Sequence, residues 1–201
     1  MMPQNIETQI LERVKRKAKG TLFFTDNILK DANPDAVRKA LERLVKAGKI
    51  DRVATGIYVR PVIDDIIGKV MPDIEEIAIA IAKRDRARIL PTGSFAMYKL
   101  GLTTQVPLNV VYYTDTSARK IQIGKQTINF KKSSSKNLAF VGGLSKLAIQ
   151  AMRTIGKDQI TDNELRQIKN ILKKENPKYL QHDLQIAPVW IRELLKGTIN
   201  D

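Results

Sequence analysis

Three basic residues, Arg38, Lys39 and Arg43, belong to a segment with helical periodicity at residues 34–47, "PDAVRKALERLVKA". Its apolar residues recur at helical spacing and are expected to be buried, which leaves the three basic side chains facing outward. Arginine can bond a guanine edge at two atoms, and both residue types bind phosphates. Arg38 and Lys39 lie early enough in the helix to reach base edges, whereas Arg43, one turn later, is expected to meet a phosphate.

A β-hairpin is expected directly after this helix, because the periodicity changes from helical to alternating at Lys49. The segments "KIDRV" and "GIYVR" flank a turn that contains Gly56, where a positive φ is easily adopted. From this hairpin, Arg52, Thr55 and Arg60 are predicted to contact the DNA backbone or the minor groove. The simpler alternative for all six DNA-binding candidates is an ordinary charged, solvated surface.

Two further helices are expected upstream of these residues. The first covers residues 5–18, and a short strand, "TLFF", follows it. Thr25 or Asp26 can then cap a short second helix. Asn33 is the expected cap of the helix described first, with Pro34 at its first position. Three helices followed by a hairpin is the element order of a winged helix-turn-helix.

The predicted fold class is therefore α+β, with two domains. Residues 1–61 are expected to form a winged helix-turn-helix DNA-binding domain, and residues 62–201 a mixed α+β regulatory domain. Residues 61–72, bounded by prolines, are interpreted as a connector. Helices are expected within 73–85, 92–101, 142–156, 161–174 and 187–197, and strands within 86–91, 108–115, 119–124 and 126–132.

The composition favours a polyanionic partner. The 201 residues include 35 Lys and Arg against 21 Asp and Glu, a formal net charge of +14. Such a field attracts nucleic acid, and double-stranded DNA is the partner expected here. The absence of cysteine excludes disulfides and thiol chemistry. Neither a secretory leader nor an apolar run long enough to span a membrane is present, so we expect a soluble cytoplasmic protein without membrane contact.

Enzymatic alternatives find little support in the sequence. The "TGS" at 92–94 and the later "VVYYTD" are faintly similar to the glycine-serine motif and acidic strand of nucleotidyltransferases, which need two carboxylates two residues apart. Asp115 is present, but Tyr113 and Ser117 occupy the positions where the second carboxylate would stand. The single histidine, His182, has no nucleophile pattern around it and is interpreted as a surface or capping residue. We therefore expect no catalytic residue, no metal and no cofactor.

A second set of basic residues lies beyond residue 61. These side chains could extend a DNA footprint or contact RNA, but a solvated helix end and a lysine-protected sheet edge explain them equally well. The set comprises Lys83, Arg84, Arg86, Arg88, Lys131, Lys132 and Lys136.

Two patches resemble the AbiEi family of bacterial type IV antitoxins: "ALERLVKAGKIDRVATGIY" and, later, "PTGSFAMYKLGLTTQVP". They match in order and spacing, and "NVVYYTD" and "RKIQIG" also fit, so the resemblance covers about residues 1–155. It implies a winged helix that represses its own operon at an inverted repeat. It also implies a second domain that counteracts a nucleotidyltransferase-type toxin without needing a stable complex. No residue receives an antitoxin role from the resemblance, because Gly93 and Gly101 can equally be a turn and a cap.

The expected function is thus DNA-binding transcriptional regulation, as an AbiEi-like antitoxin that represses its operon. Two other classes remain open. One is a protein-interaction module that uses the winged helix to bind a partner chain. The other is a nucleotidyltransferase-like enzyme that depends on Asp115.

Overall fold

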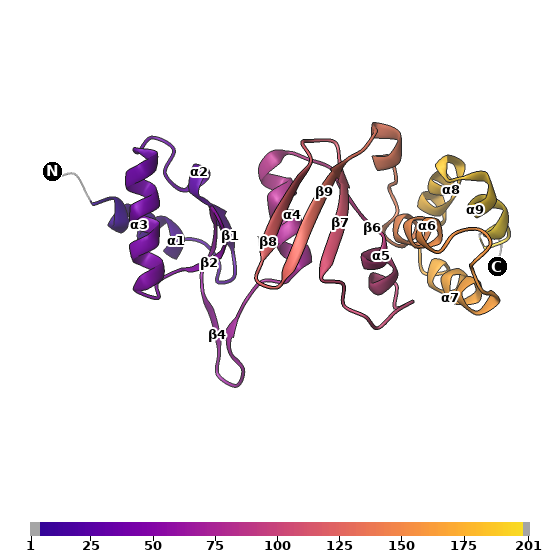
Figure 1. Cartoon of the computed structure of the whole chain (residues 1–201), viewed down its shortest axis with the longest axis horizontal. Helices are drawn as coiled ribbons and strands as arrows, with labels where there is room; N and C mark the ends of the chain where they lie inside the picture. The colour runs from indigo at the N-terminus through magenta and orange to yellow at the C-terminus, as the bar shows by residue number, and fades with distance from the viewer. Residues whose placement is uncertain (1–4, 199–201) are drawn as a thin grey trace. The chain divides into compact units, whose positions relative to one another are not determined.

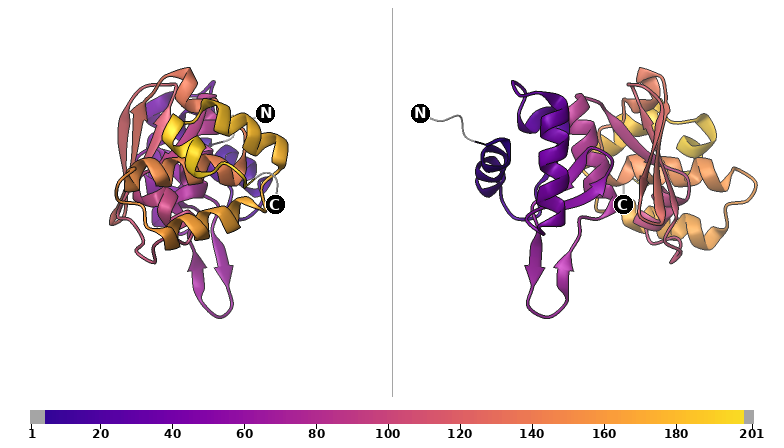
Figure 2. Two further views of the ribbon diagram at one scale, coloured as in Figure 1. Left: turned by 90° about the vertical axis from the view of Figure 1, so that its right-hand side faces the viewer. Right: turned by 60° about the vertical axis from the view of Figure 1, so that its left-hand side comes forward.

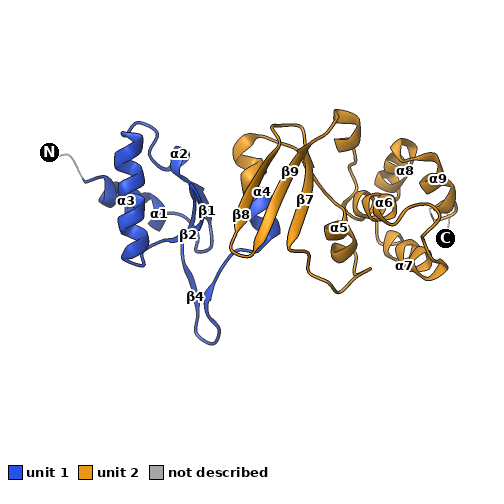
Figure 3. Cartoon of the chain, viewed as in Figure 1, with its two compact units in different colours: residues 1–80 blue, residues 81–201 orange. Residues whose placement is uncertain are grey.

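The computed structural model describes residues 5–198, which divide into two compact units (Figure 3). Unit 1 lies within residues 1–80 and unit 2 within residues 81–201. Helix α4 (Ile74–Asp85) crosses the boundary between the units. The domain boundary expected at residue 61 therefore stays a prediction.

Unit 1 begins with helices and a small sheet (Figure 1). The sheet has the strand order β1-β3-β2, and both strand pairs are antiparallel. Its central strand, β3, is buried at every residue, which explains the run of three apolar side chains there. The elements are α1 (Ile6–Lys15), β1 (Leu22–Phe24), α2 (Thr25–Ile28), α3 (Pro34–Lys46), β2 (Asp51–Ala54) and β3 (Ile57–Val59).

The core of unit 1 joins α1, α3 and the sheet. Helix α3 contributes the predicted apolar stripe, and the ring of Phe23 stacks on that of Tyr58 with centroids 5.8 Å apart. The cap of α2 was predicted wrongly. The helix begins at Thr25, and its N-cap residue is Phe24, which makes no side-chain capping bond.

The segment interpreted as a connector instead forms a second hairpin, β4 (Val62–Asp64) and β5 (Gly68–Val70). It is a two-stranded sheet of its own and extends away from the three-stranded sheet of unit 1 (Figure 2). The sequence did not predict this hairpin, because the apolar residues of the segment do not alternate and the periodicity that signals a strand is missing.

Unit 2 contains a four-stranded sheet of order β6-β7-β9-β8. The inner pair β7–β9 is parallel, and the outer pairs are antiparallel. Tyr112 and Phe130 lie opposite each other on the inner strands and stack with centroids 5.9 Å apart. The strands are β6 (Ile89–Thr92), β7 (Asn109–Thr114), β8 (Arg119–Ile123) and β9 (Gln126–Lys132).

A helical core accompanies this sheet. Its buried apolar residues come from α5 and from the four C-terminal helices, with Trp190 and Leu194 packed against them. Helix α8 was missed by the sequence interpretation, although its Asn176–Pro177 start repeats the signal that located α3. The elements are α5 (Ser94–Lys99), a 3-10 turn η1 (Ser135–Leu138), α6 (Gly143–Ile155), α7 (Asp162–Leu172), α8 (Pro177–Ile186) and α9 (Val189–Leu194).

The structure confirms a mixed α+β fold. Among residues 5–198, no helix combines the length and the apolar character needed to cross a membrane.

Candidate nucleic-acid interface

Helix α3 is positioned by its cap and its apolar stripe. The Asn33 side chain accepts hydrogen bonds from the N–H groups of Asp35 at 2.9 Å and Ala36 at 3.3 Å, and Pro34 occupies the first turn. These contacts satisfy donors that a helix start would otherwise leave open. Because Leu41 and its apolar neighbours face the core, Arg38 and the other polar residues of α3 face solvent.

Arg38 and Lys39 are exposed in the first half of α3. The Arg38 guanidinium lies 3.2 Å from the carboxylate of Asp35, and the two side chains are 62% and 76% exposed. A pair this exposed contributes at most about 1 kcal/mol to stability. A phosphate or a base edge can therefore displace Asp35 from Arg38 at little cost.

Arg43 links α3 to α1. Its Nε donates to Glu7 Oε1 at 2.9 Å, while 57% of the arginine side chain remains exposed. The sequence interpretation did not foresee this partner, because the two residues are far apart in the chain. Arg43 is thus oriented by a carboxylate and still accessible to solvent.

Two of the three hairpin candidates lie together. Arg52 Nη2 is 3.4 Å from Thr55 Oγ1, and both residues are exposed at the end of the β2–β3 hairpin. Gly56 has φ +74° in the turn between these strands, as the sequence predicted. The register of the strand pairing shifts between Arg52 and Ala54, so the pairing is irregular there.

Arg60 is placed differently from the other candidates. It is half-buried, and its Nη1 donates to the carbonyl oxygens of Lys15, at 2.9 Å, and of Lys17. A cation near these carbonyls is favourable at the end of a helix. Arg60 therefore connects the sheet to the end of α1, with its guanidinium already bonded within unit 1.

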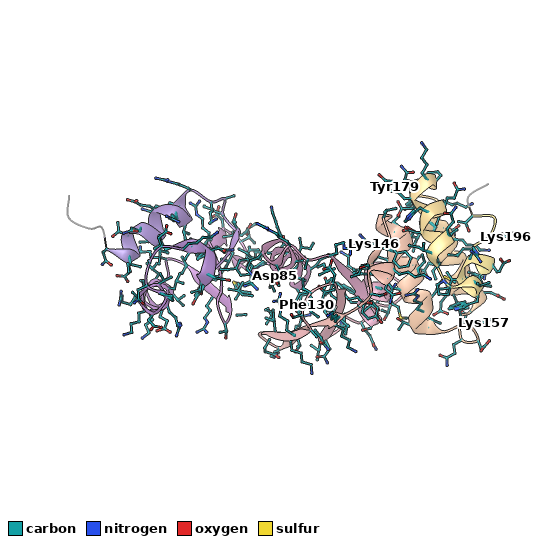
Figure 4. All side chains as sticks on the ribbon, turned by 90° about the horizontal axis from the view of Figure 1, so that it is seen from above. Asp85, Phe130, Lys146, Lys157, Tyr179 and Lys196 are labelled. Carbon is teal, nitrogen blue, oxygen red and sulfur yellow. The ribbon has the colours of Figure 1, made fainter. Side chains whose placement is uncertain are left out.

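Some side chains of the second basic set form ion pairs within unit 2. Asp85, labelled in Figure 4, accepts from Arg84 Nε at 2.7 Å and from Arg119. The Arg119 guanidinium also lies over the Phe130 ring. Burial raises the pKa of Asp85, but the bonds from the two arginines outweigh it, so the pKa lies below its ordinary value. Lys131, Lys132 and Lys136 are exposed.

Asp115, the residue of the enzymatic alternative, is held by Arg88. Its two carboxylate oxygens accept from the backbone N–H and from Nε of Arg88, each at 2.9 Å. These bonds hold the pKa of Asp115 below its usual value. Within residues 5–198, no group of three or more His, Asp or Glu side chains is arranged to hold a metal ion.

A buried polar cluster at the start of α6 was missed altogether. Asp183 is fully buried and accepts from the N–H groups of Val141 and Gly142 at 2.9 and 3.0 Å, from Ser145 Oγ at 2.5 Å, and from His182 Nδ1 at 3.0 Å. His182 is therefore a partner of a capping carboxylate.

Glu175 completes this cluster. Its Oε2 accepts from the N–H groups of Leu144 at 2.6 Å and Ser145 at 3.0 Å, and its Oε1 from that of Asn176 at 2.9 Å. Burial raises the pKa of Glu175, but these backbone donors outweigh burial and bring it below the ordinary value. The two carboxylates accept the N–H groups at the start of α6 that would otherwise lack a partner. The cluster therefore caps this helix.

Fold and candidate interface thus describe a two-unit α+β protein with a basic, solvent-facing helix in its first unit. The family model "Family of unknown function (DUF6088)" matches residues 9–180, and the chain belongs to that family. The match includes residues of both units.

One solved structure with a similar fold is the crystal structure of the RV2827C protein from Mycobacterium tuberculosis. The likeness covers 100% of this chain and 78% of that one, with a TM-score of 0.52 and 10% sequence identity. At this identity the likeness concerns the fold alone. No curated protein matches the sequence.

Proposed function

We propose that the first unit contains a winged helix-turn-helix that binds double-stranded DNA. In this proposal α3 is the recognition helix and the β2–β3 hairpin is the wing. The order α1, α2, α3 and then the hairpin supports it. The observation that carries the proposal is the solvent-facing side of α3, where Arg38, Lys39 and Arg43 are exposed opposite the buried stripe.

The candidate residues have different roles in this proposal. Arg38 and Lys39 contact base edges in the major groove, and Arg43 contacts a phosphate. Arg52 and Thr55 contact the backbone or the minor groove from the wing. Arg60 keeps its carbonyl partners and positions the sheet, so that its effect on DNA is indirect.

We further propose that the protein is a non-enzymatic transcriptional regulator, an AbiEi-like antitoxin that represses its own operon at an inverted repeat. The sequence resemblance supports this part, and direct binding of the toxin is not required. The bonds from Arg88 to both oxygens of Asp115 argue against a metal-binding role for that carboxylate.

The DNA-binding proposal is tested with fluorescence anisotropy on the duplex upstream of the gene. Binding should fall about 10³-fold over a fourfold rise in salt if six or so phosphates are contacted. The variant Arg38→Glu/Lys39→Glu/Arg43→Glu should lose binding at every salt concentration, because it places carboxylates against phosphates.

The matched control is Lys157→Glu/Lys173→Glu/Lys178→Glu, which changes three exposed lysines of unit 2. Both triple variants lower the net charge from +14 to +8, since each replacement removes two charges. The control should retain most of the affinity. Equal losses in the two variants would show that only total charge matters, and the assignment to α3 would then be wrong.

The antitoxin part has a separate readout. Co-expression with a nucleotidyltransferase-like toxin encoded in the same operon should restore growth. The α3 triple variant should lose repression of the operon promoter while still restoring growth, because unit 2 carries the proposed antitoxin role. If no such gene adjoins, or if growth is not restored, the regulator is not an antitoxin.

A further inference from the structure

The β4–β5 hairpin has a built turn at its tip. Asp64 Oδ1 accepts hydrogen bonds from the N–H groups of Ile66 at 2.9 Å and Ile67 at 3.0 Å, and Gly68 closes the turn with φ +76°. These backbone donors lower the pKa of Asp64. At neutral pH the carboxylate is therefore ionised and holds the two isoleucines in place.

Apolar side chains at this tip are exposed to solvent. Ile63 is 69% exposed, Ile66 94% and Ile67 73%. No strand among residues 5–198 pairs with the outer edge of β4 or β5. An isolated two-stranded hairpin is at best marginally stable, and exposed apolar edges are sites of further pairing. The hairpin thus has the features of a surface that another chain covers.

The acidic charge at the tip of the hairpin indicates the chemistry of the surface that would bind it. Asp64 and Asp65 lie between the exposed Ile63 and Ile66. The one lysine of the hairpin, Lys69, has its Nζ 2.7 Å from Asp51 Oδ1. The tip is therefore acidic and apolar in a protein whose net charge is +14. Phosphates of nucleic acid or of an anionic membrane would be repelled, whereas an apolar surface with a positive rim is complementary.

Such a surface lies at the base of the same hairpin. An open pocket of about 400 Å³ is lined there by apolar side chains on one side and by Lys19, Gly20 and Thr21 on the other. The apolar side chains are those of Val62, Val70, Met71 and Pro72. Glu76 also lines it, but its Oε2 accepts the Asp73 N–H at 2.9 Å within the cap of α4. Each copy of the chain therefore carries both an acidic apolar tip and a partly apolar pocket that includes one lysine.

We propose that two copies of this chain form a dimer through exchanged β4–β5 hairpins. Two hairpins lying antiparallel about a two-fold axis place the tip of each at the base of the other. Ile66 and Ile67 of one copy then fill the pocket of the second, and Asp65 faces Lys19 across the interface. The contact is reciprocal, as in an isologous dimer. It involves none of the proposed DNA-binding residues.

The dimer is tested by analytical ultracentrifugation of the full chain, without DNA, from micromolar to millimolar concentration. The wild type should be dimeric, and Ile66→Asp/Ile67→Asp should be monomeric. Both side chains are so exposed that the folded monomer should be unaffected, which circular dichroism checks. The matched control is Val106→Asp/Leu108→Asp, which alters exposed apolar residues of unit 2 and should leave the dimer intact.

A charge exchange tests the tip-to-base arrangement. Lys19→Glu should weaken the dimer about tenfold by opposing Asp65, and adding Asp65→Lys should restore it. Asp65 is chosen because Asp64 is needed for the turn. A wild type that stays monomeric, a dimer that survives the double isoleucine replacement, or a failure of the charge exchange to restore association would each overturn the proposal. Because DNA is absent, these outcomes are independent of the DNA-binding proposal.

Discussion

At the scale of single residues, the exposed arginines of α3 already have weak acidic partners. Arg38 is paired with Asp35, and Arg43 with Glu7. Such surface pairs contribute little to stability, because water and salt screen them and the side chains lose freedom. In the DNA-binding proposal, phosphates replace these carboxylates, and the carboxylates hold the guanidinium groups in the folded protein until then.

Gly142 is a residue where the available space, and not the backbone, requires glycine. Its φ is −72°, which any residue adopts, but a Cβ there would lie 2.0 Å from Ser145 Oγ and 2.7 Å from Glu175 Oε2. We expect Gly142→Ala to lower the free energy of unfolding by about 1–3 kcal/mol, because the capping carboxylates must move. Urea denaturation measures the change.

Gly143→Ala is the matched control for this prediction. A Cβ at Gly143 would have its nearest neighbour, Glu175 Oε2, at 4.0 Å. Its effect on stability should stay within about 0.5 kcal/mol, since alanine is also the better helix former. Equal destabilisation by both replacements would show that crowding around Gly142 is not the cause of the loss in stability.

At the scale of elements, two helices of this protein are capped in opposite ways. Helix α3 receives its cap from Asn33, directly before it in the sequence. Helix α6 receives its cap from Asp183 and Glu175, which lie 41 and 31 residues beyond their N–H partners Gly142 and Leu144. The first kind of cap is visible in the sequence, whereas the second exists only after the C-terminal helices have packed.

The α6 cap predicts how stability depends on pH. The pKa of Glu175 is lower in the folded than in the unfolded chain. Its stabilising contribution is therefore complete above the unfolded pKa of about 4.3 and is lost as the pH falls through the folded pKa. We expect the difference in unfolding free energy between wild type and Glu175→Gln to be large at neutral pH and to shrink below about pH 4.

Urea titrations at several pH values measure this difference. Glu193→Gln serves as the control, because Glu193 is exposed on α9 and lies 4.0 Å from Lys196. Its difference from the wild type should be small at every pH. A Glu175→Gln difference that does not change with pH would show that the carboxylate does not contribute to stability through its charge.

At the scale of the whole molecule, one hydrophobic cluster lies entirely within unit 1. Its buried members lie between Ile10 and Tyr58. We therefore expect a fragment of residues 1–72 to fold cooperatively and to keep salt-dependent DNA binding. Thermal unfolding monitored by circular dichroism, together with anisotropy, tests both.

Leu41→Ala in the same fragment provides the control. Leu41 is fully buried, and its truncation should cost about 2–5 kcal/mol, a large part of the stability of a domain of this size, and so lower its melting temperature. A fragment that is unfolded even without the replacement would show that unit 1 depends on residues beyond 72. The winged-helix assignment would then need the longer unit.

Much of the fold could be predicted because its signals are local. Asn33 and Pro34 located α3, Gly56 located the hairpin turn, and the capping box of Thr161 and Glu164 located α7. Helix α8 carried an equally local signal that was overlooked. The β4–β5 hairpin had only its turn residues Asp64 and Gly68 as a local signal, because its isoleucines are exposed and do not follow a buried face.

The sequence by itself determined a basic α+β chain with an outward-facing basic helix. The reason is that periodicity, caps and charge depend on residues close together in the sequence. Only the tertiary structure decided that Arg60 is bound by the end of α1, that Glu7 faces Arg43, and that β9 lies between β7 and β8. The reason is that these contacts join residues distant in sequence, and packing alone selects which of many polar side chains meet.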